Sequence, residues 1–331
     1  MRFSDIVGQQ YAKSILLKAA NTGRLPHALI FSGPAGTGKK TLARALTMLL
    51  NCQNPLPDGG CGSCKICRQI VEGNFPDLYI VAPEKHRSKI SIDQIRDIYA
   101  KLGFAPIFNL RVIVIDRAEE MTEEAANAFL RILEEPPSKN IFILNVLEPL
   151  NLLPTIVSRC QNIRFYPIPT EEITEWLIKS KGLDNDTAVL ISRMCEGSIG
   201  KAVELIEKDF LKKREDWISL FTKLPVLNKD EVLSLLEEML KNRDELLDML
   251  IVWRGWVRDL IVMKETSDKE LLINKDLSHM AKKLANRYPL EELILVMDHI
   301  HSAEQDISKN RNVALVMRKI IMELHNLRPV L

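Results

Sequence analysis

A glycine-rich turn between an apolar run and a helical pattern constrains the fold of this chain more than any other feature. The apolar run covers residues 27–32, the turn reads GPAGTGK over residues 33–39, and a helical pattern follows. A strand, a glycine-rich turn and a helix in this order are typical of an α/β domain built on a parallel sheet. Further apolar runs without alternation suit strands covered on both faces, at residues 78–80, 111–116, 141–144 and 163–165.

The second half of the chain shows helical periodicity almost throughout, so we predict an α/β domain followed by all-α material. Pro167 and Pro169 interrupt the pattern between the two halves, and Thr170 is expected to cap the next helix. The predicted parts are an α/β core over residues 1–166, a small helical unit over residues 167–208 and a helical domain over residues 209–331.

The composition excludes several classes of protein. With 331 residues, 46% of them hydrophobic, the chain can bury sizeable cores and is neither disordered nor collagen-like. Its 45 Lys and Arg residues balance 44 Asp and Glu residues, and the formal net charge of +1 gives no long-range attraction to DNA or to a membrane. Neither a signal peptide nor a membrane-spanning run is recognisable, so we expect a cytoplasmic protein whose cysteines are reduced or metal-bound.

The glycine-rich turn has the spacing of a phosphate-binding loop. In such a loop successive backbone N–H groups surround an anion, and the lysine reaches the outer phosphates of ATP or ADP. The alternative is a strand-to-helix turn that binds nothing. The candidate phosphate-binding residues are Gly33, Gly36, Thr37, Gly38 and Lys39.

The positions that would carry catalysis depart from an ATPase. Lys40 stands where a hydroxyl should coordinate Mg²⁺, and Thr41 comes one place later. Asp116 is the candidate Mg²⁺ carboxylate at a strand end, but Arg117 replaces the acid that would orient water. We therefore predict weak or absent nucleotide binding and no hydrolysis. The rival interpretation is an active ATPase in which Thr41 reaches Mg²⁺ and Glu119 orients water.

Four cysteines lie close together in the sequence, with spacing C-x8-C-x2-C-x2-C and glycines between them. Four thiolates at such separations predict a closed tetrahedral zinc site with a structural role, and an iron–sulfur cluster is the competing interpretation. The candidate ligands are Cys52, Cys61, Cys64 and Cys67, whereas Cys160 and Cys195 stand alone and are expected to be small buried side chains.

A zinc-containing DNA-binding module is a further rival interpretation of this region. Lys65, Arg68 and the basic residues 85–87 could contact phosphates. The even charge balance argues against strong autonomous binding, and a solvated basic loop explains the same residues.

Together these features resemble one family, the bacterial clamp loaders of the AAA+ class. The resemblance rests on the phosphate loop, the four-cysteine insertion after its helix, the segment LEEPP at residues 133–137 and the triplet SRC at residues 158–160. Similarity at residues 197–202 and 310–315 extends it over essentially the whole chain. It implies an AAA+ core with an inserted zinc module, a helical lid at the small helical unit and an oligomerising collar at the C-terminal helical domain.

Within that family the chain is more similar to the non-hydrolysing delta prime subunits of DNA polymerase III than to the ATP-hydrolysing gamma or tau subunits. Lys40 and Arg117 are two of the discriminating residues. Gly200 stands where hydrolysing subunits carry a phosphate-sensing arginine, and Val146-Leu147 lacks the polar sensor of that family.

The resemblance also implies roles for single residues and for partners. Arg159 would point across an interface at the γ-phosphate bound by a neighbouring subunit, and Val7 would lie near adenine. The implied partners are gamma or tau and delta subunits. Through the complex the chain would act on a sliding clamp and primer-template DNA, with no membrane partner.

Overall fold

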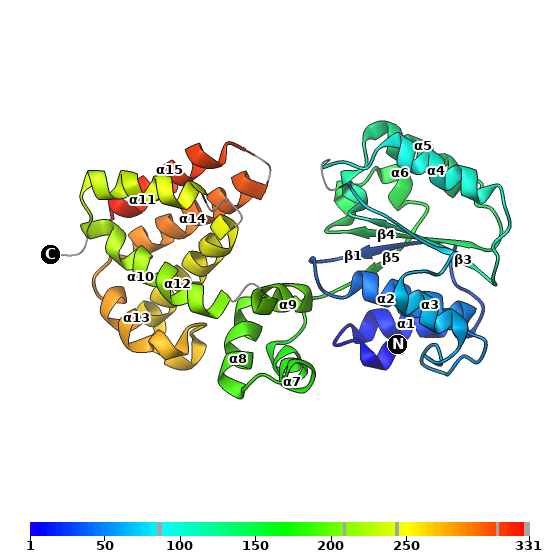
Figure 1. The fold of residues 1–331 in the computed structure, drawn as a ribbon, viewed down its shortest axis with the longest axis horizontal. Coiled ribbons are helices and arrows are strands. Elements are labelled where there is room, and N and C mark those ends of the chain that lie inside the picture. The colour runs from blue at the N-terminus through cyan, green and yellow to red at the C-terminus, as the bar shows by residue number, and fades with distance from the viewer. Residues whose placement is uncertain (85–87, 208–209, 242–244, 309–310, 328–331) are drawn as a thin grey trace. The chain divides into compact units, whose positions relative to one another are not determined.

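A computed structural model describes residues 1–84, 88–207, 210–241, 245–308 and 311–327 of the chain. The chain divides into two compact units, Met1–Ala202 and Val203–Leu331 (Figure 1). The division into core, lid and collar at residues 166 and 208 stays a prediction.

The first unit is built on a five-stranded parallel sheet in the order β2-β3-β4-β1-β5. This confirms the predicted α/β fold with a parallel sheet. The strands are β1 (Ala28–Ser32), β2 (Leu78–Val81), β3 (Arg111–Asp116), β4 (Asn140–Val146) and β5 (Gln161–Arg164).

Helices cover both faces of this sheet, and the strand residues alternate between the two resulting cores. Leu29 and Phe31 of β1 belong to the core of the helices α1 and α2, whereas Ala28 and Ile30 belong to the core of α4, α5 and α6 (Figure 1). Burial of both sets explains why the strand sequences are apolar without alternation. The helices are α1 (Gln10–Asn21), α2 (Lys39–Asn51), α3 (Lys65–Glu72), α4 (Ile92–Leu102), α5 (Glu123–Glu134) and α6 (Pro154–Val157).

Three further helices, α7 (Thr170–Lys181), α8 (Asn185–Met194) and α9 (Ile199–Glu207), follow β5. The expectation that Thr170 caps a helix is wrong. Pro169 occupies the N-cap of α7, with no side-chain hydrogen bond there, and Thr170 is already the first helical residue. Proline is favoured near helix starts because its φ is preset and its missing N–H is not needed there.

The second unit is helical and has its own core. Its longest helix is α12, whose Trp253 and Trp256 are fully buried. Its helices are α10 (Phe210–Lys223), α11 (Lys229–Lys241), α12 (Leu246–Thr266), α13 (Ser278–Ala285), α14 (Leu290–Ser308) and α15 (Val313–His325). Short 3-10 helices of the two units cover Phe3–Asp5, Ala118–Glu120, Pro149–Asn151, Leu224–Val226, Lys269–Leu271 and Lys275–Leu277.

A buried polar network fastens the loop after α12 to the helices of this unit. The Asp259 carboxylate is fully buried and accepts hydrogen bonds from the backbone N–H groups of Ile273 and Asn274, at 2.8 and 2.7 Å. Asn274 in turn accepts a bond from the buried Arg214 guanidinium at 2.7 Å. Buried charges are stable only when they are paired in this way.

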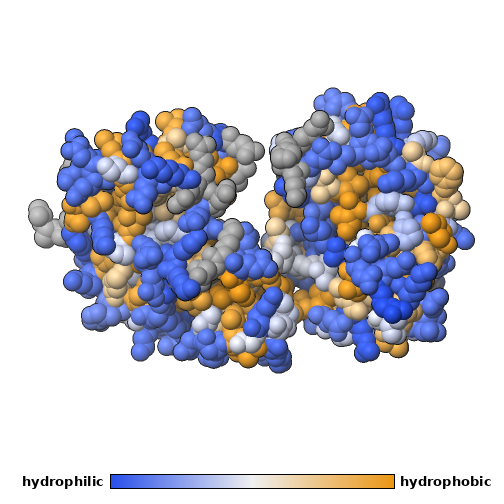
Figure 2. Space-filling model, in the orientation of Figure 1, coloured by the Kyte–Doolittle hydropathy of each residue, from blue (hydrophilic) through white to orange (hydrophobic). Residues whose placement is uncertain are grey.

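In the described part of the chain, no helix combines the length and apolarity needed to cross a membrane. Hydrophilic residues cover most of the face of each unit that Figure 2 presents, with separate apolar areas among them.

Candidate functional site

The phosphate-loop sequence forms the turn between β1 and α2, at the carboxyl end of its strand. Gly33 has φ 140°, and a Cβ there would lie 2.2 Å from the Phe165 backbone oxygen. Gly36 has φ 71°, and a Cβ there would lie 2.1 Å from the Ser198 hydroxyl oxygen. The loop therefore needs glycine at both positions, for its backbone conformation and for the close approach of its neighbours.

The loop lysine binds its own loop. Lys39 Nζ donates to the backbone oxygens of Gly33 and Pro34, the latter at 2.7 Å. Burial lowers the pKa of the Lys39 ammonium, and the carboxylates of Glu119 and Asp116 oppose that shift. In this conformation the ammonium interacts with the carbonyl dipoles of Gly33 and Pro34.

Lys40 forms an ion pair with Asp116, the candidate Mg²⁺ carboxylate. Lys40 Nζ lies 3.0 Å from Asp116 Oδ2, and Asn145 Nδ2 donates to Asp116 Oδ1 at 3.0 Å. Both carboxylate oxygens of Asp116 thus have partners from this chain. Thr41, the hydroxyl invoked by the rival interpretation, is exposed on the first turn of α2.

Asn145 was missed by the reading of the sequence. It is buried and stands directly opposite Asp116 in the β3–β4 register. A polar residue directly after the apolar run 141–144, near the carboxyl end of the strand, was the available signal. The expectation about a polar sensor residue concerned the pair Val146-Leu147, one place later.

The residue directly after Asp116 is Arg117, so no acid stands there to orient a water molecule. Arg117 is exposed in a left-handed conformation with φ 56°. Glu119 Oε1 accepts a hydrogen bond from the Leu147 backbone N–H at 3.2 Å. One oxygen of the carboxylate that the rival ATPase would use is therefore bonded to the end of β4, while Glu119 Oε2 is buried and has no hydrogen-bond partner among the described residues.

The start of α9 lies directly against the phosphate loop. The Gly200 N–H donates to the Gly36 oxygen at 3.0 Å, and a Cβ at Gly200 would lie 2.8 Å from Gly36 Cα. No side chain fits at residue 200 in this arrangement. The glycine that replaces the expected phosphate-sensing arginine thus lets the helix start touch the loop.

The N-terminal segment is tied to the loop by Gln9, which belongs to the segment 7–9 that the family resemblance places near adenine. The Gln9 side-chain amide donates to the backbone oxygens of Thr37 and Tyr166, at 3.3 and 2.7 Å, and accepts from the Tyr166 N–H at 3.1 Å. Val7, the candidate adenine neighbour, is half-buried two residues earlier.

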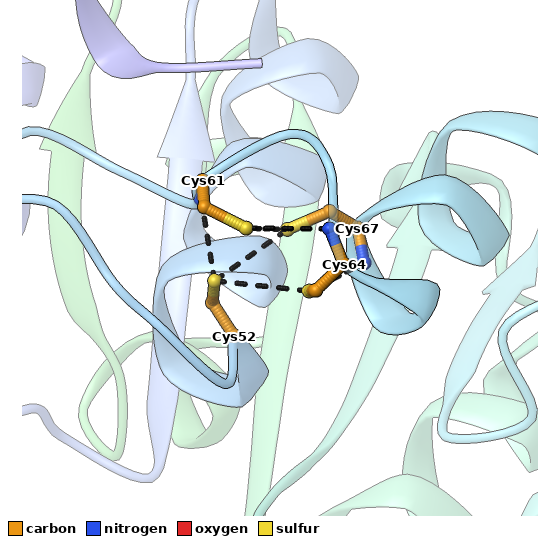
Figure 3. Close-up of side chains that lie close together, drawn as sticks. All are labelled: Cys52, Cys61, Cys64 and Cys67. Carbon is orange, nitrogen blue, oxygen red and sulfur yellow. Dashed lines mark hydrogen bonds between the residues drawn. The ribbon is translucent and has the colours of Figure 1, made fainter.

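The four clustered cysteines converge on one point (Figure 3). Cys52 follows the end of α2, Cys64 caps α3 and Cys67 lies within it, while Cys61 comes from the turn between the two helices. Their Sγ atoms all lie within 4.8 Å of one another, with separations of 3.9 Å for Cys52–Cys64 and 4.0 Å for Cys61–Cys67. Tetrahedral zinc with Zn–S bonds of about 2.3 Å places sulfur atoms about 3.8 Å apart.

Hydrogen bonds prepare these sulfur atoms for a metal. The backbone N–H groups of Cys61 and Cys64 donate to the Sγ atoms of Cys52 and Cys61, at 3.2 and 3.4 Å. The Ser63 hydroxyl and neighbouring backbone N–H groups lower the pKa of Cys61 to about 5, whereas burial raises that of Cys67 to about 12. A bound cation favours the thiolate form of every ligand. The four cysteines can hold a metal such as zinc.

Arg159 lies just beyond the short helix α6, with its side chain 37% exposed. Its Nη2 donates to Glu134 Oε1 at 2.9 Å, and its Nη1 donates to the Thr155 oxygen at 3.0 Å. Among the described residues its polar partners are these two and Ser158, none of which belongs to the chain's own phosphate loop.

A parallel sheet with a phosphate-loop sequence, a four-cysteine insertion and a C-terminal helical unit agree with the class of protein that the sequence resembles, the clamp-loader subunits. Residues 8–169 match the family model described as DNA polymerase III, delta subunit. DNA polymerase III subunit delta' of Yersinia pestis is 30% identical over 80% of this chain and 78% of its own length. The same subunit of Escherichia coli K12 is 29% identical over 95% of this chain and 93% of its own length. The chain belongs to the delta' family of DNA polymerase III clamp-loader subunits.

The tau subunits are also relatives. DNA polymerase III subunit tau of Bacillus subtilis is 27% identical over 92% of this chain, and the match spans 58% of the tau subunit. The chain is therefore similar in sequence to both delta' and tau subunits, and the site residues are needed to distinguish between the two.

Proposed function

We propose that this chain acts as the delta' subunit of a DNA polymerase III clamp loader, does not hydrolyse ATP itself, and supplies Arg159 to the ATP site of a neighbouring subunit. The observation that carries the non-hydrolysing part is the ion pair between Lys40 and Asp116, reinforced by Asn145. The proposed partners are gamma or tau and delta subunits, with which the chain would load a sliding clamp onto primed DNA during replication.

The ion pair opposes hydrolysis for an electrostatic reason. Phosphoryl transfer in P-loop proteins uses Mg²⁺ held by the loop hydroxyl and by a strand-end aspartate. Here the Lys40 ammonium lies 3.0 Å from Asp116 Oδ2, and a cation bound to the same carboxylate would be repelled by the charge of Lys40. Arg117, exposed and without a carboxylate, supplies no base for water.

The closed loop supports weak or absent nucleotide binding. Lys39 is engaged by loop carbonyls, and the start of α9 contacts Gly36. A phosphate that binds the Lys39 ammonium would have to replace its bonds to the Gly33 and Pro34 oxygens. The loss of those bonds reduces the net affinity.

The exposed Arg159 supports action in trans. A guanidinium supplied by a neighbour stabilises the charge that develops during phosphoryl transfer. The rival active ATPase, with Thr41 and Glu119 as its machinery, has less support because Asp116 is paired with Lys40 and Thr41 is exposed on α2. For the cysteine cluster we propose structural zinc, because the sulfur separations match a single tetrahedral ion better than a multi-iron cluster.

Two ATPase measurements test the proposal. The purified chain should show no Mg²⁺-dependent ATP hydrolysis above background, and robust hydrolysis would refute the non-hydrolysing role.

In the reconstituted complex, Arg159→Ala should lower the ATPase rate by about 10³-fold at the site that Arg159 completes, as expected for an arginine finger. Arg131→Ala, which removes an exposed arginine from α5, serves as the control and should leave the rate unchanged. An unchanged rate in Arg159→Ala would overturn the finger assignment.

A further inference from the structure

The backbone that carries Arg159 is held on both sides. Its N–H donates to the Ile156 oxygen at 3.1 Å, and the next N–H, of Cys160, donates to the Val157 oxygen at 3.2 Å. Ile156 is fully buried, and the Cys160 side chain packs against the same core, where burial raises its pKa to about 11. The freedom that remains to Arg159 is therefore mainly in its side-chain torsions.

Two hydrogen bonds restrict those torsions. Nη1 is bonded to the Thr155 oxygen, one turn earlier, and Nη2 to the Glu134 carboxylate. Glu134 is the last residue of α5, and its position is set by the buried Leu133 before it and by Pro136, which follows shortly after. A glutamate at a helix C-terminus faces the negative end of the helix dipole, so a cationic partner is especially favourable there.

The guanidinium keeps donors for another ligand. Arginine has five N–H groups in a rigid fork, and the contacts with Thr155, Ser158 and Glu134 use at most three of them. With its side chain 37% exposed, Arg159 can donate to an oxyanion without first giving up the bond to Glu134.

We propose that Glu134 is a positioning residue for Arg159. It holds the guanidinium in the orientation in which Arg159 would act as an arginine finger on the ATP site of the neighbouring subunit. This inference rests on the finger role proposed above. A long arginine side chain loses rotamer freedom when it engages a phosphate, and a partner that restricts it beforehand reduces that loss. Because Glu134 acts through Arg159, its removal should matter only while Arg159 is present.

The test uses the reconstituted complex and compares steady-state ATPase kinetics. Glu134→Ala should lower kcat by about two- to fivefold, the range expected for one half-exposed ion pair, with KM for ATP unchanged. Glu134→Gln keeps an oxygen that can accept the Nη2 bond and should lie closer to the wild type than Glu134→Ala. The matched control is Glu135→Ala, the neighbouring exposed glutamate, which should behave as the wild type.

A double mutant separates positioning from a general structural role. Arg159→Ala combined with Glu134→Ala should be no slower than Arg159→Ala alone, whereas an additional loss would overturn the proposal. A higher kcat in Glu134→Ala would also overturn it, because Glu134 would then be sequestering the finger. If Arg159→Ala lowers the rate and Glu134→Ala does not, only the positioning role fails. If Arg159→Ala itself has no effect, the finger assignment fails and the positioning role with it.

Discussion

At the scale of residues, an ammonium group stands where the phosphate-loop pattern has a hydroxyl. Lys40 pairs with Asp116 at 3.0 Å, and Asn145 takes the other oxygen of the same carboxylate. The three residues come from the start of α2 and from the ends of β3 and β4. Their meeting makes the candidate Mg²⁺ carboxylate the acceptor of an internal ion pair.

Removing that ammonium should therefore favour a metal-bound nucleotide. Lys40→Ser is expected to raise the affinity of the chain for Mg·ATP by roughly tenfold, since the repulsion between two cations near Asp116 disappears. The measurement is equilibrium binding of a fluorescent ATP analogue at fixed Mg²⁺. Lys18→Ser, an exposed lysine on α1, is the control for net charge. Equal affinity in Lys40→Ser and the wild type would contradict the electrostatic explanation.

At the scale of elements, the four cysteines join the end of α2 to the start of α3. Ile66 and Ile70 of α3 pack with Met48 of α2, so the two helices share a small core beside the sulfur atoms. The N-terminal segment is attached to the same insertion through the Phe3 N–H, which donates to the Asp58 oxygen at 2.8 Å. A metal in the cluster would stabilise the packing of α2, α3 and the N-terminal segment.

We expect one zinc ion per chain by elemental analysis of the purified protein. Cys64→Ser should lose the ion and unfold at lower temperature, because a structural zinc contributes its binding free energy to folding. Cys195→Ala, which removes a buried cysteine outside the cluster, should retain the zinc. Iron in place of zinc, or no metal at all, would refute the zinc assignment.

At the scale of the whole molecule, the candidate site residues all lie in the first unit, while the second unit has an independent helical core. In the second unit the buried Asp259 carboxylate accepts hydrogen bonds from the N–H groups of Ile273 and Asn274. A failure of that network should consequently affect the helical unit and leave the metal cluster unchanged.

Asp259→Ala should cost about 3–5 kcal/mol of unfolding free energy, because the partners of the lost carboxylate stay buried without an acceptor. Denaturant unfolding followed by tryptophan fluorescence measures this loss, since Trp253 and Trp256 lie in the same core. The control is Asp216→Ala, an exposed aspartate of α10, for which we expect no measurable change. A zinc content below that of the wild type would contradict the independence of the two units.

Much of the architecture was predictable from the sequence because it depends on local patterns. Apolar runs without alternation predicted the parallel strands, and the spacing of glycines and of cysteines predicted the loop and the cluster. The helix cap at Thr170 was predicted wrongly, because Ser and Thr statistics gave no weight to Pro169 in the N-cap position.

The sequence by itself thus determined the class of fold, the loop and the cluster of four cysteines, whose signals are periodicity and short spacing. Only the tertiary structure decided which distant residues meet: Lys40 with Asp116, Asp116 with Asn145, Gly200 with Gly36, and Glu134 with Arg159. The physical reason is that strand register and helix packing place these groups within hydrogen-bond distance, and neither is written in the pattern of a single segment.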